Sequence, residues 1–219
     1  MVCLHEPSAS DTSTSHVPPP HAAHSALADL LLGTVEDAQL VAKAILDRFG
    51  SLNAALSAGV RELSTIPAMT VVAVSRLAAT TAVHHCALRG ILAARDVIGS
   101  WQALEHYALA KLRCSPVEEA RILLLDRKNG LIADELLGQG TVDHVPLYPR
   151  EVVRKALEHH ASAVILMHNH PSGDPTPSSA DIAMTRKVAA ALATMDVALH
   201  DHAIVGRNRV LSMRGAGHF

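Results

Sequence analysis

The spacing of apolar residues predicts a helical N-terminal half. Six apolar residues recur at steps of three and one, as in a helix that buries one face; they are Ala38, Val41, Ala42, Ile45, Leu46 and Phe49. Gly50 stands where a helix C-cap glycine belongs, Ser51 begins a second short helix, and Pro67 interrupts the pattern. An Ala- and Val-rich helix is predicted over about 71–92. We therefore expect a small all-α helical domain over residues 25–100.

The C-terminal half follows a different pattern, in which strand-length apolar runs alternate with helices. The runs 121–126 and 131–137 are separated by an Asn-Gly pair, which favours a β-hairpin because both residues tolerate positive φ. A helix is predicted from Pro149, and the continuous apolar run 161–167 predicts a strand buried on both faces. A loop rich in Pro, Ser and Gly, an amphipathic helix and two closing strands follow. This alternation predicts an α/β or α+β domain over residues 101–219.

The first residues have the composition of a disordered tail. Residues 1–24 are rich in Ser, Thr, Pro and His and carry few apolar groups. We expect three histidines of this segment, His16, His21 and His24, to lie in solvent. The segment has neither the basic n-region nor the apolar h-region of a secretory signal.

Composition narrows the functional classes. The chain of 219 residues has a formal net charge of −2, so no global basic charge indicates nucleic acid or an anionic membrane. Aromatic residues make up 2% of the chain, which argues against a base-stacking platform. No uninterrupted apolar run approaches the roughly 18 residues of a membrane span, so we expect no membrane partner. Cysteine is rare and forms no CxxC pair, which fits a reducing cytoplasm, whereas 15 histidines keep metal chemistry open.

The segment from His168 to Asp181 is the strongest candidate for chemistry. His168 and His170 lie two apart at the end of the predicted buried strand, and residues i and i+2 of an extended chain point to the same side. The Pro- and Gly-containing loop that follows can return Asp181, in the first turn of the next helix, to the same point. Two imidazoles and one carboxylate form a three-ligand set in which zinc keeps an open position and lowers the pKa of its water.

Part of this segment also has a structural interpretation. Ser178 and Asp181 are spaced as the N-cap and N3 residues of a capping box. The two interpretations can hold together, because a helix start that Ser178 fixes also fixes Asp181 for ligation.

The same residues carry a family resemblance. The spacing His-x-His, seven residues, Ser, two residues, Asp is similar to the JAMM motif of MPN (JAB) metalloproteases, with His168, His170, Ser178 and Asp181 at its positions. The longer text YPREVVRKALEHHASAVILMHNHPSGDPTPSSADI, followed by DHAIVG, resembles the bacterial RadC (UPF0758) family over about residues 26–219. The resemblance implies an MPN/JAB-like mixed sheet flanked by helices, with cytidine-deaminase-like layering, after the helical domain. It implies one Zn²⁺ per chain on His168, His170 and Asp181, with Ser178 hydrogen-bonding the developing oxyanion.

The family also places a glutamate just before the first strand as general base. Here that residue is Glu118, with its neighbour Glu119 as the alternative if the register slips by one. The implied activity is that of a zinc-dependent metallopeptidase or isopeptidase with a peptide or protein substrate. A carboxylate would take a proton from the attacking water and return it to the leaving amine.

Other polar residues near the motif have two interpretations each. His200 and His202 repeat the i, i+2 spacing, and DHAIV resembles a RadC landmark. Asp201 and His202 are therefore either groups that support the metal ligands or hydrogen-bonded structural residues. Arg150 and Glu151, at a predicted helix start, are expected to be structural or to line the cleft.

The N-terminal half departs from the family in a way that bears on DNA. RadC-type proteins resemble helix-hairpin-helix DNA binders there, but the matching stretch 66–70 contains no glycine. We expect the positive φ and the close backbone approach of glycine to be lost, and the helical domain is neutral overall, so DNA binding is weakly supported. Alternatives to the peptidase are a DNA-repair-associated accessory protein without catalysis and a zinc nuclease. A homodimer is implied only because MPN domains often pair.

Overall fold

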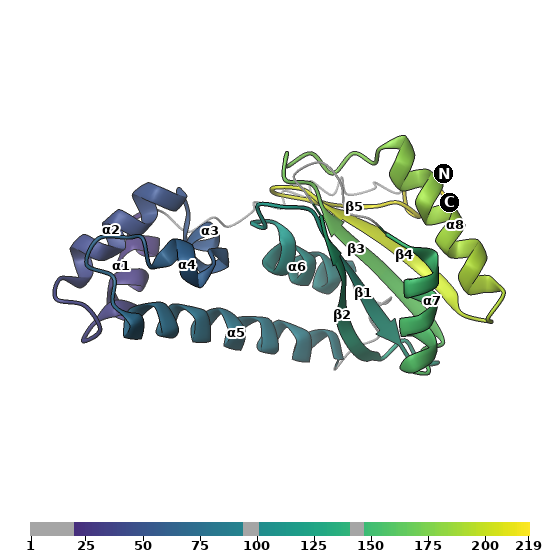
Figure 1. Cartoon of the computed structure of the whole chain (residues 1–219), viewed down its shortest axis with the longest axis horizontal. Helices are drawn as coiled ribbons and strands as arrows, with labels where there is room; N and C mark the ends of the chain where they lie inside the picture. The colour runs from purple at the N-terminus through teal and green to yellow at the C-terminus, as the bar shows by residue number, and fades with distance from the viewer. Residues whose placement is uncertain (1–19, 94–100, 141–146) are drawn as a thin grey trace, which may run out of the picture.

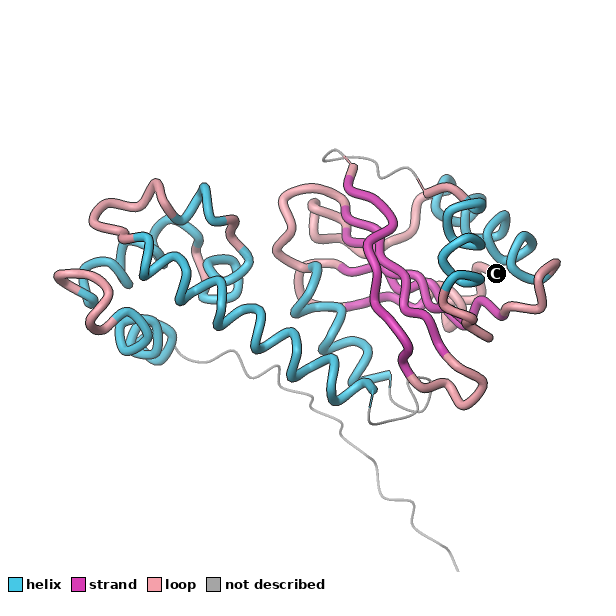
Figure 2. The backbone as a smooth tube through the Cα atoms, turned by 60° about the horizontal axis from the view of Figure 1, so that its bottom comes forward, coloured by secondary structure: helices cyan, strands magenta, loops and turns pink. Residues whose placement is uncertain are grey.

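A computed structural model describes residues 20–93, 101–140 and 147–219. A group of short helices lies at one end of the molecule and a sheet covered by helices at the other (Figure 1). One long helix extends from the short helices toward the sheet, as Figure 2 shows from a second direction. The predicted class, a mixed α/β fold preceded by a helical region, is confirmed.

Residues 20–93 form five helices, and the two caps predicted from the sequence, Gly50 and Ser51, are present. They are α1 (Pro20–Leu31), α2 (Ala38–Phe49), α3 (Leu52–Ser57), α4 (Val60–Leu63) and α5 (Val71–Ala93). Gly50 adopts a left-handed φ of 73° and ends α2, and the Ser51 side chain accepts from the Ala54 N–H at the start of α3. The apolar stripe of α2 packs into one core with α1, α3 and α5.

The predicted boundary of the tail is wrong at its C-terminal end. Helix α1 already begins at Pro20, because proline suits a first helical turn, where its missing N–H needs no partner and its φ is preset. His21 and His24 therefore lie on a helix, and His24 Nε2 lies 3.2 Å from the Gln39 carbonyl oxygen. Residues 1–19, which include His16, lie outside the described residues.

The loop between α4 and α5 corrects a second expectation. Ala68 adopts a φ of 62°, so the positive φ is present although no glycine supplies it. The loop is held by Thr70, whose hydroxyl donates to the Thr34 carbonyl (2.6 Å) and accepts from the Ala73 N–H (3.1 Å). These contacts keep Ala68 in a conformation that costs a residue with a Cβ roughly 1–2 kcal/mol.

Replacing Ala68 by glycine is expected to raise the free energy of unfolding by about 0.5–1 kcal/mol, because the relief of strain exceeds the added entropy of the unfolded chain. Urea denaturation monitored by circular dichroism measures the change. The control is Ala78→Gly on the exposed face of α5, which is expected to lower the stability by about 1 kcal/mol. If Ala68→Gly is destabilising as well, the loop stores no such strain.

Helix α5 changes the expectation about membranes. By length and composition, Val71–Ile91 could span a membrane: its mean hydropathy is 1.3, and 17% of the tested window is buried. The sequence prediction considered only uninterrupted runs of apolar residues, and Arg76 interrupts the run in this helix. Its many alanines and valines nevertheless keep the mean hydropathy of the window high. One such helix is weak grounds for a span, because the test considers length and composition only. Here Arg76 Nη1 donates to the Leu30 and Leu32 carbonyls, and α5 packs against α3 and α6.

The second part of the chain is a five-stranded mixed sheet with helices on both faces. Its elements are α6 (Trp101–Leu112), β1 (Glu119–Leu125), β2 (Leu131–Gln139), α7 (Pro149–Glu158), β3 (Ala163–Asn169), α8 (Ser179–Ala193), β4 (Ala198–Val205) and β5 (Val210–Ser212). The strand order is β2-β1-β3-β4-β5, and β3 and β4 run parallel while the other neighbours are antiparallel. The predicted β1–β2 hairpin is present, and within its Asn-Gly pair Asn129 supplies the positive φ, at 61°.

Alternation along β1 and β3 gives each face of the sheet its own core. Ile122, Leu124, Val164 and Leu166 pack with α7 and α8 on one face. Leu123, Leu125, Ile165 and Met167 pack with α6 on the other face (Figure 1). In both strands, even-numbered residues therefore face α7 and α8, and odd-numbered residues face α6.

Candidate metal centre

Strand β3 brings two histidines to the face that α7 and α8 cover. His168 is paired with Ala120 of β1, is 3% exposed, and lies within the strand. His170 follows the strand end, and its N–H donates to the Val205 carbonyl (3.0 Å), which keeps the backbone beside β4. The two rings lie on the same side with centroids 4.9 Å apart, as the i, i+2 spacing predicts.

The loop after His170 returns to these histidines because it is anchored on the end of β4. The Arg207 N–H donates to the Gly173 carbonyl (2.9 Å), and Gly173 has a φ of 88°. Gly206 is needed for this approach, since a Cβ there would lie 2.6 Å from the Gly173 carbonyl oxygen. Helix α8 begins after this loop and carries Asp181 in its first turn.

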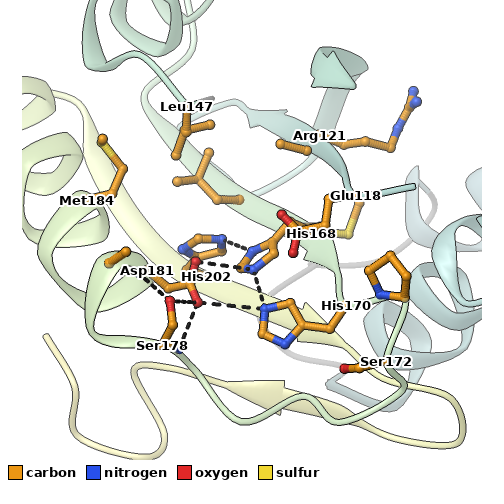
Figure 3. Close-up of a pocket in the computed structure, with 15 residues that line it drawn as sticks. Glu118, Arg121, Leu147, His168, His170, Ser172, Ser178, Asp181, Met184 and His202 are labelled. Atoms are coloured by element: carbon orange, nitrogen blue, oxygen red, sulfur yellow. Dashed lines mark hydrogen bonds and ion pairs between the residues drawn. The ribbon is translucent and has the colours of Figure 1, made fainter. Parts of the chain in front are cut away.

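His168, His170 and Asp181 lie together as predicted (Figure 3). The two Nε2 atoms are 3.0 Å apart, and Asp181 carboxylate oxygens lie 3.5 Å from His168 Nε2 and 3.6 Å from His170 Nε2. Donor atoms bound to one zinc ion at tetrahedral angles lie about 3.3 Å from each other, given bonds of about 2.0–2.1 Å. The three separations therefore fit one zinc ion, and the role of these residues as its ligands stays a prediction.

The orientation of His170 also fits a metal. Its Nδ1 lies 2.8 Å from the Asp174 carbonyl oxygen. A carbonyl only accepts, so Nδ1 carries a hydrogen and the lone pair of the neutral ring is on Nε2. Nε2 is the nitrogen that faces His168 and Asp181, so the ligand atom lies on the correct side of the ring.

The charges of the three residues depend on one another. Burial lowers the pKa of His168 to about 4. A hydrogen bond to the Asp181 carboxylate raises the pKa of His170. Burial would raise the pKa of Asp181, but hydrogen bonds and positive charge from the histidines, with donors from Ser178, hold it far below its usual range. Asp181 is therefore a carboxylate, and a metal competes with a proton for His170, so metal binding weakens as the pH falls.

Ser178 has the structural role that its spacing predicts. Its Oγ accepts from the Asp181 N–H (3.1 Å), and Asp181 Oδ2 accepts from the Ser178 N–H (2.8 Å), which completes a capping box. The Ser178 hydroxyl hydrogen is directed to Asp181 Oδ2, at an oxygen–oxygen distance of 2.6 Å. The predicted hydrogen bond to an oxyanion stays a prediction, and it requires this hydrogen to turn from Asp181 toward the substrate.

The two candidate glutamates lie on opposite faces of the sheet. Glu118 lines the cavity of the metal centre (Figure 3), and its negative charge contributes to the raised pKa of His170. Glu119 accepts from Arg121 Nη1 at 2.8 Å, and Arg121 also donates to Asp134. Alternation at the start of β1 explains the difference, because even-numbered residues share the face of His168. The structure thus brings Glu118, and not Glu119, to the candidate ligands.

The sequence reasoning missed Asn169, between the two histidines. Its side chain faces the opposite way and is 1% exposed. Asn169 Oδ1 accepts from the Glu119 N–H (2.8 Å), and its Nδ2 donates to the Val117 carbonyl (3.0 Å). These two peptide groups flank Glu118, so Asn169 holds the backbone that carries the candidate general base. Its place between two candidate ligands on a buried strand was the only sign of this role.

Replacing Asn169 by alanine is expected to lower the free energy of unfolding by about 1–3 kcal/mol, because the part-buried Glu119 N–H and Val117 carbonyl lose their partner. Urea denaturation of the metal-free protein measures this. The control is Asn53→Ala at an exposed position of α3, which is expected to change the stability by less than about 0.5 kcal/mol. Similar stabilities for both variants would contradict the bracing role.

Two residues of the segment DHAIV, Asp201 and His202, have different roles in the structure. Asp201 is structural, since its carboxylate accepts from the His202 N–H (2.7 Å), the Arg214 N–H (3.1 Å) and the Ser212 hydroxyl (2.5 Å). His202 lies beside the candidate ligands, with Nε2 at 2.8 Å from His168 Nδ1, and burial holds its pKa well below the usual value. Its Nδ1 lies 2.7 Å from Thr185 Oγ1.

Thr185 was also missed as a residue of this neighbourhood. It is fully buried on α8, on the helix face that packs into the core with Val188 and Leu192. A polar side chain on an otherwise apolar helix face was the available sign.

The metal centre lies in a cavity of about 330 Å³ with one polar and one apolar part. Glu118 and Ser178 line the polar part together with the three candidate ligands. The apolar lining residues include Ala120, Leu147, Leu166 and Met184. Of these, Leu147 and Met184 lie on the far side of Asp181 and His202 from His170 (Figure 3). Arg150 and Glu151 do not line it and form ion pairs on α7 instead. A cavity of this size and mixed lining can hold one side chain of a substrate beside the reacting group.

The chain is similar in sequence to a known domain family and to bacterial proteins. A family model described as the RadC-like JAB domain matches residues 98–218. A UPF0758 protein of Rhodobacter capsulatus is 47% identical over 182 residues, which cover 83% of this chain and 85% of the relative. A UPF0758 protein of Ruegeria pomeroyi is 44% identical over 183 residues, which cover 84% of this chain and 82% of the relative.

Proposed function

Because this chain belongs to the RadC (UPF0758) family and its fold is JAB-like, we propose that it is a zinc-dependent hydrolase that cleaves peptide or isopeptide bonds. The observation that supports the proposal most strongly is the metal centre itself. The two imidazole Nε2 atoms are 3.0 Å apart, and Asp181 lies 3.5 Å from His168 through its Oδ1 and 3.6 Å from His170 through its Oδ2. A further carboxylate, that of Glu118, lines the same cavity.

Each polar residue of the cavity has a role in this proposal. His168, His170 and Asp181 would hold the zinc ion, which when bound acts as a Lewis acid and lowers the pKa of a water toward 7. Glu118 accepts a proton from the attacking water and donates it to the leaving amine. Ser178 donates its hydroxyl hydrogen to the oxygen of the scissile carbonyl as negative charge develops there.

The apolar part of the cavity supports an amide substrate with an apolar side chain. Leu147 and Met184 lie on either side of the gap beyond Asp181 (Figure 3). An apolar side chain of a peptide would be buried there, which removes its surface from water and orients the neighbouring carbonyl. We propose that the enzyme acts in a reducing cytoplasm, in accord with its low cysteine content and with Cys86 and Cys114, which form no disulfide among the described residues.

The test is a cleavage assay on a mixture of synthetic peptides and lysine-linked isopeptides, with products identified by mass spectrometry. The zinc-loaded wild type is expected to cleave a subset with apolar residues beside the scissile bond. Chelation should stop cleavage, and added zinc should restore it. Zinc bound at the site without cleavage of any amide would instead favour the non-catalytic accessory protein.

A further inference from the structure

We propose that Thr185 and His202 form a hydrogen-bond relay that holds the His168 ring with its Nε2 lone pair toward His170 and Asp181. Both are thus positioning residues for the metal, and the inference rests on the metal site of the proposed function. The relay begins at the Asp181 carbonyl on α8 and ends at His168 on β3. It therefore connects the backbone of one ligand residue to the side chain of another.

The direction of the relay is set at Thr185. Its Oγ1 lies 2.6 Å from the Asp181 carbonyl oxygen, and since a carbonyl only accepts, the one hydroxyl hydrogen lies between these two oxygens. Met213 Sδ, at 3.6 Å, is a weaker acceptor. Thr185 has 0% exposure, so no solvent molecule at the surface offers its hydroxyl another partner. In its contact with His202, Thr185 Oγ1 is therefore the acceptor.

His202 passes this direction on. Its Nδ1 lies 2.7 Å from Thr185 Oγ1 and must supply the hydrogen of that contact, because the threonine hydrogen is already used. His202 is 4% exposed among core residues, where a neutral ring costs far less than a charged one. A neutral imidazole has a single N–H, so His202 Nε2 is an acceptor.

His168 completes the relay. Its Nδ1 lies 2.8 Å from His202 Nε2 and therefore donates, which leaves the lone pair on His168 Nε2. That atom lies 3.0 Å from His170 Nε2 and 3.5 Å from Asp181 Oδ1. The reverse order would turn the Thr185 hydrogen toward His202 and leave two oxygens 2.6 Å apart with no hydrogen between them. In the proposed order, the hydrogen of the 3.0 Å contact between the two Nε2 atoms of the zinc-free chain comes from His170.

The relay has a functional consequence. Metal-binding histidines generally donate their second N–H to a fixed acceptor, which sets the tautomer and the ring orientation. For His170 this acceptor is the Asp174 carbonyl. For His168 it is a second imidazole, whose own orientation comes from a hydroxyl on the helix that carries Asp181. A change at Thr185 should therefore reach the metal although Thr185 is no ligand.

Nuclear magnetic resonance tests the relay directly. Long-range ¹H–¹⁵N correlation spectra of the full, zinc-free chain at neutral pH distinguish Nδ1–H from Nε2–H tautomers. We expect the Nδ1–H tautomer for both His168 and His202. The Nε2–H tautomer at His168 would overturn the proposal.

Zinc titration tests the consequence. Thr185→Val keeps the shape of the side chain without the hydroxyl, and we expect it to weaken zinc binding about 10–100-fold. The matched control, Thr194→Val, changes an exposed hydroxyl on the same chain and should leave the affinity unchanged. His202→Gln keeps an acceptor for His168 and should bind zinc more tightly than His202→Leu. Thermal unfolding shows whether each variant is folded, and equal affinity of folded Thr185→Val and wild type would overturn the positioning role.

These measurements separate the relay from the proposed activity. If the wild type shows the expected tautomers and binds zinc in a Thr185-dependent way but cleaves no amide, the hydrolase proposal fails and the relay stands. If the wild type binds no zinc at any concentration tested, the positioning role fails together with the metal site.

Discussion

Replacing Asp181 by alanine is expected to reduce the zinc content from about one ion per chain to none and to abolish amide hydrolysis with it. Asp181 is the anionic member of the ligand set, and its carboxylate oxygens lie 3.5 and 3.6 Å from the two Nε2 atoms. Without it, two neutral imidazoles remain, and they attract a divalent cation far less strongly. Elemental analysis of gently purified wild type and variant measures the difference.

Asp181 also caps α8, so a second variant separates the two roles. Asp181→Asn keeps an oxygen that can accept from the Ser178 N–H, and it removes the charge. We expect it to retain more helix stability than Asp181→Ala but to lose most of the bound zinc. The control Asp47→Ala deletes an exposed carboxylate of α2 and should change neither the stability of α8 nor the zinc content. A wild type that contains no zinc even after zinc is supplied would contradict the metal centre.

Those parts of the site that depend on local periodicity could be predicted from the sequence. The i, i+2 spacing of His168 and His170 decides their common side as soon as the strand is recognised. Likewise, Ser178 and Asp181 form a capping box within a single helical turn. These residues act through neighbours close in sequence, and local patterns suffice for them.

The parts that depend on distant contacts could not be predicted in this way. Thr185 and His202 meet across α8 and β4, and Asn169 reaches the segment before β1. Ala68 shows the same limit for backbone conformation, because its positive φ is imposed by the helices on either side of a turn and not by its own preference. In each case, packing between elements decides the outcome.

The choice between Glu118 and Glu119 lies between these extremes. Alternation along β1 assigns the two residues to opposite faces, but only once the register of β1 against β3 is known, with Ala120 opposite His168. That register comes from the pairing of two strands far apart in the chain. A one-residue slip would exchange the two glutamates, which is why the sequence left both open.

Replacing Glu118 by glutamine is therefore expected to lower kcat for amide hydrolysis about 10²–10⁴-fold while the zinc content stays at that of the wild type. Glutamine has nearly the size of glutamate but neither accepts nor returns a proton, so the loss would fall on proton transfer and not on metal binding. Glu119→Gln is the matched control, because Glu119 faces Arg121 on the other side of the sheet. Steady-state kinetics with elemental analysis on the same samples measures both effects. If Glu119→Gln removes the activity and Glu118→Gln does not, Glu118 is not the general base and the assignment is wrong.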